Sequence, residues 1–141
     1  MEIPLKPVGR EEIRKLESAL LVMALFDKET FEAIKDPSAR VTWVDSLYTA
    51  AAAFARERAG VPISKIAEEL GVTEGTIRRH LKGETKAGQL VLKVFEKLAK
   101  EGFKIDLPQE LAPLDCSKEL EELRSKIEKV KKALNEIQSW L

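Results

Sequence analysis

The residues with the clearest chemical potential lie between residues 66 and 83, in the stretch IAEELGVTEGTIRRHLKG. It carries three closely spaced cations, Arg78, Arg79 and Lys82. An arginine guanidinium can donate two parallel hydrogen bonds to guanine or to phosphate, and a lysine can bind the nucleic-acid backbone. Two interpretations therefore compete: a surface that reads DNA, and the solvated outer face of two core helices.

Residues around these cations extend the candidate nucleic-acid surface. The hydroxyls of Thr73 and Thr76 can bond phosphate, and so can backbone N–H groups at the start of a helix. Glu74 can accept a hydrogen bond from a cytosine amino group, but it also repels phosphates. The expected DNA contacts are Ser64, Lys65, Thr73, Glu74, Gly75, Thr76, Arg78, Arg79, Lys82 and Lys86.

The residues between these polar positions predict two short helices joined by a sharp turn. Gly71 falls at the turn, where glycine adopts a left-handed backbone at least cost. Thr73 is a good N-cap for the helix that follows. The inward face is expected to comprise Ile63, Ile66, Ala67, Leu70, Val72, Ile77 and Leu81. The small side chain of Ala67 would let the two helices approach closely.

The segment GVTEGTIRRHL resembles the second-helix pattern of response-regulator and sigma-factor-like DNA-binding domains, within the helix-turn-helix superfamily. The matching positions are Ala67, Gly71, Thr73, Thr76, Ile77, His80 and Leu81. This resemblance implies that the second helix enters the major groove while the first braces it against the backbone. The longer run through GETKAGQLVLKVFEKL is similar to an archaeal regulatory domain found near KaiC-type ATPases, which implies a regulatory role.

Helical periodicity covers most of the chain and predicts an all-α fold, a helical bundle that contains the helix-turn-helix. Apolar residues recur at helical spacing over residues 10–26 and again over residues 88–100. Asp27 is expected to cap a short helix, and Asp36 followed by Pro37 is expected to open a long one. The buried side of the long helix is expected to comprise Trp43, Val44, Leu47, Ala51 and Phe54. No segment has a convincing strand pattern.

Three parts are expected along the chain. A helical domain would occupy residues 1–102, with the helix-turn-helix at residues 62–83. A linker with two prolines would follow over residues 103–116, and a C-terminal dimerisation helix over residues 117–141.

Apolar residues in the last segment alternate by three and four positions, in an uninterrupted a/d pattern over three heptads. They are Leu120, Leu123, Ile127, Val130, Leu134, Ile137 and Leu141. So narrow a stripe favours a coiled-coil-like seam. A lone helix of about 25 residues is marginally stable, so it needs a partner, either a second copy or its own domain.

In a parallel pair Glu119 would meet Arg124 favourably and Lys126 would meet Lys131 unfavourably, so the direction of pairing stays open. We expect a homodimer because two-fold symmetric proteins match palindromic DNA sites.

Composition narrows the classes of function. The chain has 24 basic and 24 acidic residues, so any DNA surface must be a local patch. One cysteine, Cys116, excludes an intrachain disulfide, and with the single His80 it argues against a metal site. His80 is expected to be a packed helix residue.

The most apolar run, residues 18–26, is too short to span a bilayer and no signal peptide is apparent, so we expect a cytoplasmic protein without membrane contacts. Few Asn and Gln beside many Lys, Arg and Glu fit a thermophile.

No catalytic constellation is visible in the sequence. The glycines are scattered and no GK[ST] phosphate loop occurs. Neighbouring carboxylates on a helix point about 100° apart, a poor geometry for a paired acid and base. We therefore expect a non-enzyme without a cofactor.

The predicted function is a DNA-binding transcriptional regulator that binds double-stranded DNA as a homodimer. The alternative is a regulatory protein–protein interaction module that uses the helix-turn-helix shape without DNA.

Overall fold

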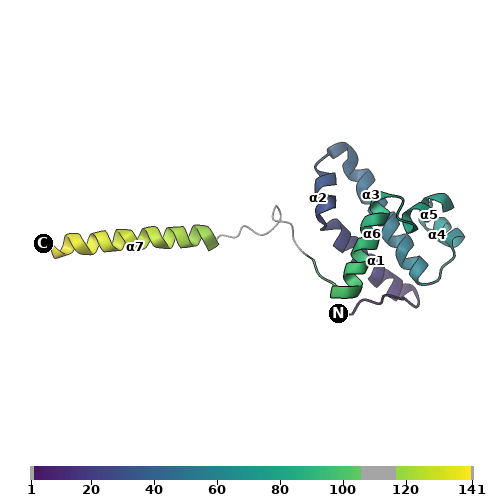
Figure 1. Cartoon of the computed structure of the whole chain (residues 1–141), viewed down its shortest axis with the longest axis horizontal. Helices are drawn as coiled ribbons and strands as arrows, with labels where there is room; N and C mark the ends of the chain where they lie inside the picture. Colours follow the sequence, from purple (N-terminus) through teal and green to yellow (C-terminus); the bar gives the residue numbers. More distant parts are fainter. Residues whose placement is uncertain (1, 106–116, 141) are drawn as a thin grey trace. The chain divides into compact units, whose positions relative to one another are not determined.

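The computed structural model describes residues 2–105 and 117–140, and throughout these residues the regular structure is helical (Figure 1). The helices are α1 (Arg10–Leu25), α2 (Lys28–Ile34), α3 (Pro37–Arg58), α4 (Ile63–Leu70), α5 (Glu74–Leu81), α6 (Lys86–Glu101) and α7 (Ser117–Ser139). The predicted all-α fold is confirmed. The chain divides into two units, residues 1–108 and residues 109–141, and each is described by itself.

Local side-chain chemistry sets the helix starts in the first unit. The Asp27 carboxylate accepts a hydrogen bond from the Glu29 N–H at 3.0 Å, which opens α2. Asp36 accepts from the Ser38 N–H at 3.0 Å, and Pro37 begins α3 as expected. The hydrogen bond from the Ser38 side chain is the main cause that lowers the pKa of Asp36. These two predicted caps are confirmed.

The core lies where α1, α3 and α6 pack against one another. Leu16 and Leu20 of α1 meet Leu47 of α3 and Leu90 and Val91 of α6, all fully buried. The alanine run of α3 is buried throughout residues 50–55. Small side chains there let neighbouring helices approach α3 from more than one side.

One predicted core position of α3 is wrong. Val44 is 38% exposed, and Val41 and Tyr48, which are three and four positions away on the same helix, are exposed as well. The expectation placed Val44 on the buried side together with Trp43, Leu47, Ala51 and Phe54. Trp43 itself is half-buried, and its indole N–H donates to the hydroxyl of Thr30 at 3.2 Å.

The second unit contributes one described helix, α7. The a/d residues from Leu120 to Ile137 are each between 50% and 60% exposed. The last predicted seam residue, Leu141, and the thiol of Cys116 lie outside the described residues, as does most of the predicted linker. Of the helices in the described part of the chain, none has both the length and the apolar character required to cross a membrane.

Candidate nucleic-acid interface

The turn between α4 and α5 has the geometry that the sequence predicts. Gly71 ends α4 with a left-handed backbone, φ 67° and ψ 32°. The N–H of Val72 then donates to the carbonyl of Ala67 at 3.1 Å, which satisfies one of the last carbonyls of the helix. A Cβ at Gly71 would meet nothing within 4 Å, so backbone conformation rather than space requires glycine here.

Three helices share a small apolar cluster beneath this turn. Ile66 and Ala67 of α4 and Ile77 of α5 are buried against Ala53 of α3. The remaining predicted inward residues are partly buried and pack on the same cluster; they are Ile63, Leu70, Val72 and Leu81. The predicted inward face is therefore confirmed, and the helix-turn-helix rests on α3.

The beginning of α5 is fixed by its own hydroxyls. The Oγ1 of Thr73 accepts from the N–H of Thr76 at 3.2 Å, which confirms Thr73 as the N-cap. The two hydroxyl oxygens of Thr73 and Thr76 also lie 2.9 Å apart. A guanidinium nitrogen of Arg79 lies 3.4 Å from the Thr76 hydroxyl. Thr76 is half-buried, and its hydroxyl already contacts the N-cap hydroxyl of Thr73. It is therefore less available to a phosphate than the exposed Thr73.

The end of α5 is held by α6 through contacts that sequence reasoning missed. The buried imidazole of His80 places Nδ1 2.7 Å from the Oγ1 of Thr85, the N-cap of α6. That hydroxyl also accepts from the N–H of Gly88 at 2.9 Å. Burial, and secondarily the charge of Arg79, lowers the pKa of His80, so the ring is neutral at pH 7. The expectation that His80 is a packed helix residue is confirmed.

The other predicted DNA contacts are exposed, but they do not form one continuous patch. Arg78 donates to the Glu74 carboxylate at 3.1 Å, one turn earlier on α5. Lys65 instead lines a cavity beside α1, and Lys86 lines another beside α2. The residues that lie on the outer side of α5 or at its ends are Thr73, Glu74, Gly75, Arg78, Arg79 and Lys82, while Ser64 lies in the first turn of α4.

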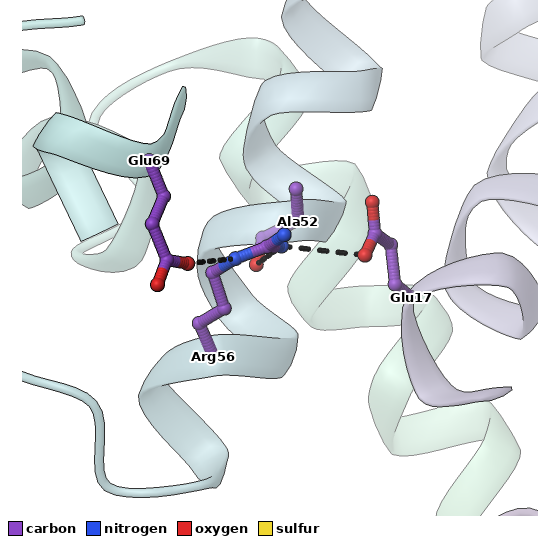
Figure 2. A network of polar contacts seen from close by, with 4 residues as sticks. All are labelled: Glu17, Ala52, Arg56 and Glu69. Carbon is purple, nitrogen blue, oxygen red and sulfur yellow. Dashed lines mark hydrogen bonds and ion pairs between the residues drawn. The ribbon is translucent and has the colours of Figure 1, made fainter. Parts of the chain in front are cut away.

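A second missed feature is the position of Arg56, which ties α3 to both α4 and α1 (Figure 2). Its Nε donates to the Glu69 carboxylate at 2.9 Å, and its Nη1 donates to Glu17 at 3.3 Å and to the Ala52 carbonyl at 3.0 Å. Glu17 precedes Arg56 by 39 residues, and no local pattern in the sequence signals this pairing. The bridge links α4 and α1 to α3 by polar contacts, beside the apolar packing of α4 on Ala53.

No group of three or more His, Cys, Asp or Glu side chains in residues 2–105 and 117–140 is placed to hold a metal ion. The site therefore consists of a braced helix with exposed cations.

Among known proteins, the chain is 55% identical over 104 residues to an uncharacterized protein of Methanocaldococcus jannaschii. The match covers 74% of this chain and 64% of the relative, so the chain spans less than two thirds of that protein. The relative comes from a thermophilic archaeon, in agreement with the composition. No model of a known protein family matches the chain, and no solved structure does so either.

Proposed function

We propose that the chain is a DNA-binding transcriptional regulator in which α5 enters the major groove. The observation that carries the proposal is the way α5 is supported. α3, α4 and α6 pack against its inner side, while Arg78, Arg79 and Lys82 remain exposed on its outer side. A helix that is packed on its inner side and carries exposed cations on its outer side suits binding in a groove.

The dimensions of α5 suit this role. An α-helix with its side chains is about 10–12 Å across, so it fits a major groove about 12 Å wide, and the eight residues of α5, Glu74–Leu81, extend for about 12 Å. The first turn of a recognition helix meets base edges, and here it carries Glu74 and Gly75. Gly75 has no side chain to hold the backbone away from a base or phosphate.

The ion pair between Arg78 and Glu74 does not prevent such binding. Their side chains are 51% and 46% exposed, and a pair of this kind contributes about 1 kcal/mol or less. Arg78 can therefore exchange Glu74 for a guanine or a phosphate at small cost. Glu74 would then be free to accept from a cytosine amino group.

The proposed active form is a homodimer joined through α7. Its apolar seam is exposed along the described length of the helix, and a second copy would bury it. Two copies of α5 would then read two half-sites of a palindromic DNA site.

Selection from a random double-stranded DNA library at low salt, with the full chain, tests the proposal. We expect one enriched sequence, bound more weakly as salt rises because phosphate contacts release counterions. The double variant Arg78→Ala/Arg79→Ala should bind that sequence much more weakly. In the binding that remains, the slope of log K against log salt concentration should become shallower by about 0.9 for each phosphate contact removed. The double variant Lys6→Ala/Lys100→Ala removes the same charge from exposed positions elsewhere and should bind like the parent.

Failure to enrich any sequence would refute the DNA proposal. The competing function is a protein interaction module. The equal numbers of acidic and basic residues and the Arg78–Glu74 pair favour it, because both reduce the net positive charge offered to phosphate. A folded chain that does not bind DNA would favour that alternative over the DNA proposal.

A further inference from the structure

A cavity of about 820 Å³ lies between α1, α3 and α4, on the side of α3 that carries Arg56. We name it the α1–α3–α4 cavity. Its volume is within the range of small-molecule sites, about 300–1,000 Å³. None of the expected functions of the chain uses it, except that Lys65 lies on its wall.

The charges of the α1–α3–α4 cavity are unequal. Four cations line it, Arg10, Arg14, Arg56 and Lys65, against the carboxylates of Glu17 and Glu69. Within the described residues, both carboxylates form their ion pairs with Arg56. They therefore do not neutralise the other three cations of the cavity.

Three cations of the cavity are left for a ligand. Arg10, Arg14 and Lys65 are exposed, and no residue in the described part of the chain forms an ion pair with them. A concave surface lined by unneutralised charge of one sign concentrates ions of the opposite sign. The cavity is therefore suited to an anion, and guanidinium groups suit phosphate in particular.

The other walls are apolar or aromatic. Tyr48 of α3 lines the α1–α3–α4 cavity with its ring half exposed, and Ile13 and Val61 add aliphatic surface. An exposed aromatic side chain can stack on a planar ring. Stacking of this kind stabilises bound nucleobases, and it does so for every base because each has a flat face. We propose that this cavity binds a nucleoside phosphate, with the phosphate on Arg10, Arg14 and Lys65 and the base against Tyr48.

The position of Arg56 gives the ligand a route to the helix-turn-helix. Figure 2 shows the guanidinium between Glu69 of α4 and Glu17 of α1, and it lies in the wall of the same cavity. A phosphate held on Arg10, Arg14 and Lys65 would place a second anion near Arg56, where it would compete with Glu69 and weaken the ion pair that links α3 to α4. Ligand would then change DNA affinity, a consequence that rests on the proposed function.

Titration calorimetry of the full chain tests the binding step without DNA. The probes are ATP and AMP, with adenosine as the ring alone and pyrophosphate as the anion alone. We expect nucleotides to bind more tightly than either fragment. The double variant Arg10→Ala/Arg14→Ala should weaken ATP binding roughly tenfold or more, because hydrogen bonds to charged groups are lost. Tyr48→Ala should weaken ATP but leave pyrophosphate unchanged.

The matched control is Lys28→Ala/Lys100→Ala, which removes two exposed cations outside the cavity and should bind ATP like the parent. Equal weakening by this control would mean binding by overall charge and would overturn the proposal. So would absence of nucleotide binding, or adenosine or pyrophosphate binding as tightly as ATP. The substituted residues are all exposed: Arg10, Arg14, Tyr48, Lys28 and Lys100. Circular dichroism should therefore show the helix content of the parent in each variant.

DNA affinity measured with and without ATP separates the two proposals. ATP binding by a chain that enriches no DNA sequence would support the cavity and refute the proposed function. Sequence-specific DNA binding by a chain that binds no nucleotide would do the reverse.

Discussion

Replacing Gly88 by alanine should loosen the junction between α5 and α6. A Cβ at this position would lie 2.3 Å from the carbonyl oxygen of His80 and 3.0 Å from its carbonyl carbon and Cα. All three are backbone atoms at the end of α5, so no side-chain rotation can relieve the contact. The start of α6 would have to move away from α5, which would stretch the hydrogen bond between His80 of α5 and Thr85, the N-cap of α6.

The expected cost of Gly88→Ala is the difference between two opposing effects. Overpacking in a close-packed interior costs about 1–3 kcal/mol. Alanine in place of glycine inside a helix gains about 0.5–1 kcal/mol. At 2.3 Å the contact is severe, so overpacking outweighs the gain and the net loss of stability should be about 1–2 kcal/mol.

Urea denaturation followed by tryptophan fluorescence measures this loss. The chain has two tryptophans, so a Trp140→Phe background leaves Trp43 as the reporter of the first unit. Gly75→Ala is the matched control on α5, because its nearest non-neighbouring atom is the Thr73 hydroxyl oxygen at 3.9 Å. That variant should gain about 0.5–1 kcal/mol. A Gly88→Ala chain as stable as the parent would refute the reasoning, and so would equal destabilisation by both substitutions.

Three further substitutions probe other contacts. Because burial lowers the pKa of His80 below its ordinary 6.5, the unfolded chain binds that proton more readily, and stability falls as the pH drops below 6.5. His80→Gln should remove this part of the pH dependence, measured by urea denaturation at several pH values. Arg56→Met leaves Glu17, whose side chain is 14% exposed, without its cation. The free energy of unfolding should fall by about 1–2 kcal/mol, as measured by thermal denaturation. Ile127→Glu places a charge in the α7 seam, and light scattering should show that self-association is lost.

Two of these substitutions have a matched control. Arg56→Lys keeps the charge but not the forked geometry, so it should recover only part of the stability; full recovery would show that geometry is unimportant. Lys129→Glu lies off the apolar row of α7 and should still self-associate. If the parent chain is itself a monomer, the dimer proposal is wrong. An unchanged pH profile in His80→Gln would mean that other groups control acid sensitivity.

The features that could be predicted from the sequence are those decided within one or two helical turns. Asp27, Asp36 and Thr73 cap helices through hydrogen bonds to residues two or three positions away, and Gly71 adopts its left-handed backbone locally. Periodicity likewise found the inward face of the helix-turn-helix. The wrong position, Val44, has a side chain of the right type, but burial there depends on whether another helix covers that part of α3.

The features that sequence reasoning missed are contacts between different helices. The bridge from Arg56 to Glu17 joins residues 39 positions apart, and it gives no periodic or motif signal. The close approach of Gly88 to His80 had a partial signal, because Thr85 before a helical pattern is a favourable N-cap residue. That pattern predicts a helix start at residue 86 but not which backbone lies against it.

The helix-turn-helix has little core of its own, and this determines how its orientation can be controlled. Its fully apolar cluster consists of Ile66, Ala67 and Ile77 on Ala53 of α3, and each of its helices is only eight residues long. Helices so short are not stable alone, so their placement depends on neighbours. The neighbours act at two polar points, Arg56 at α4 and Thr85 at α5. Arg56 is the one that a cavity ligand could reach, so any control of α5 by small molecules should act through α3 and α4, while the α5–α6 junction stays fixed.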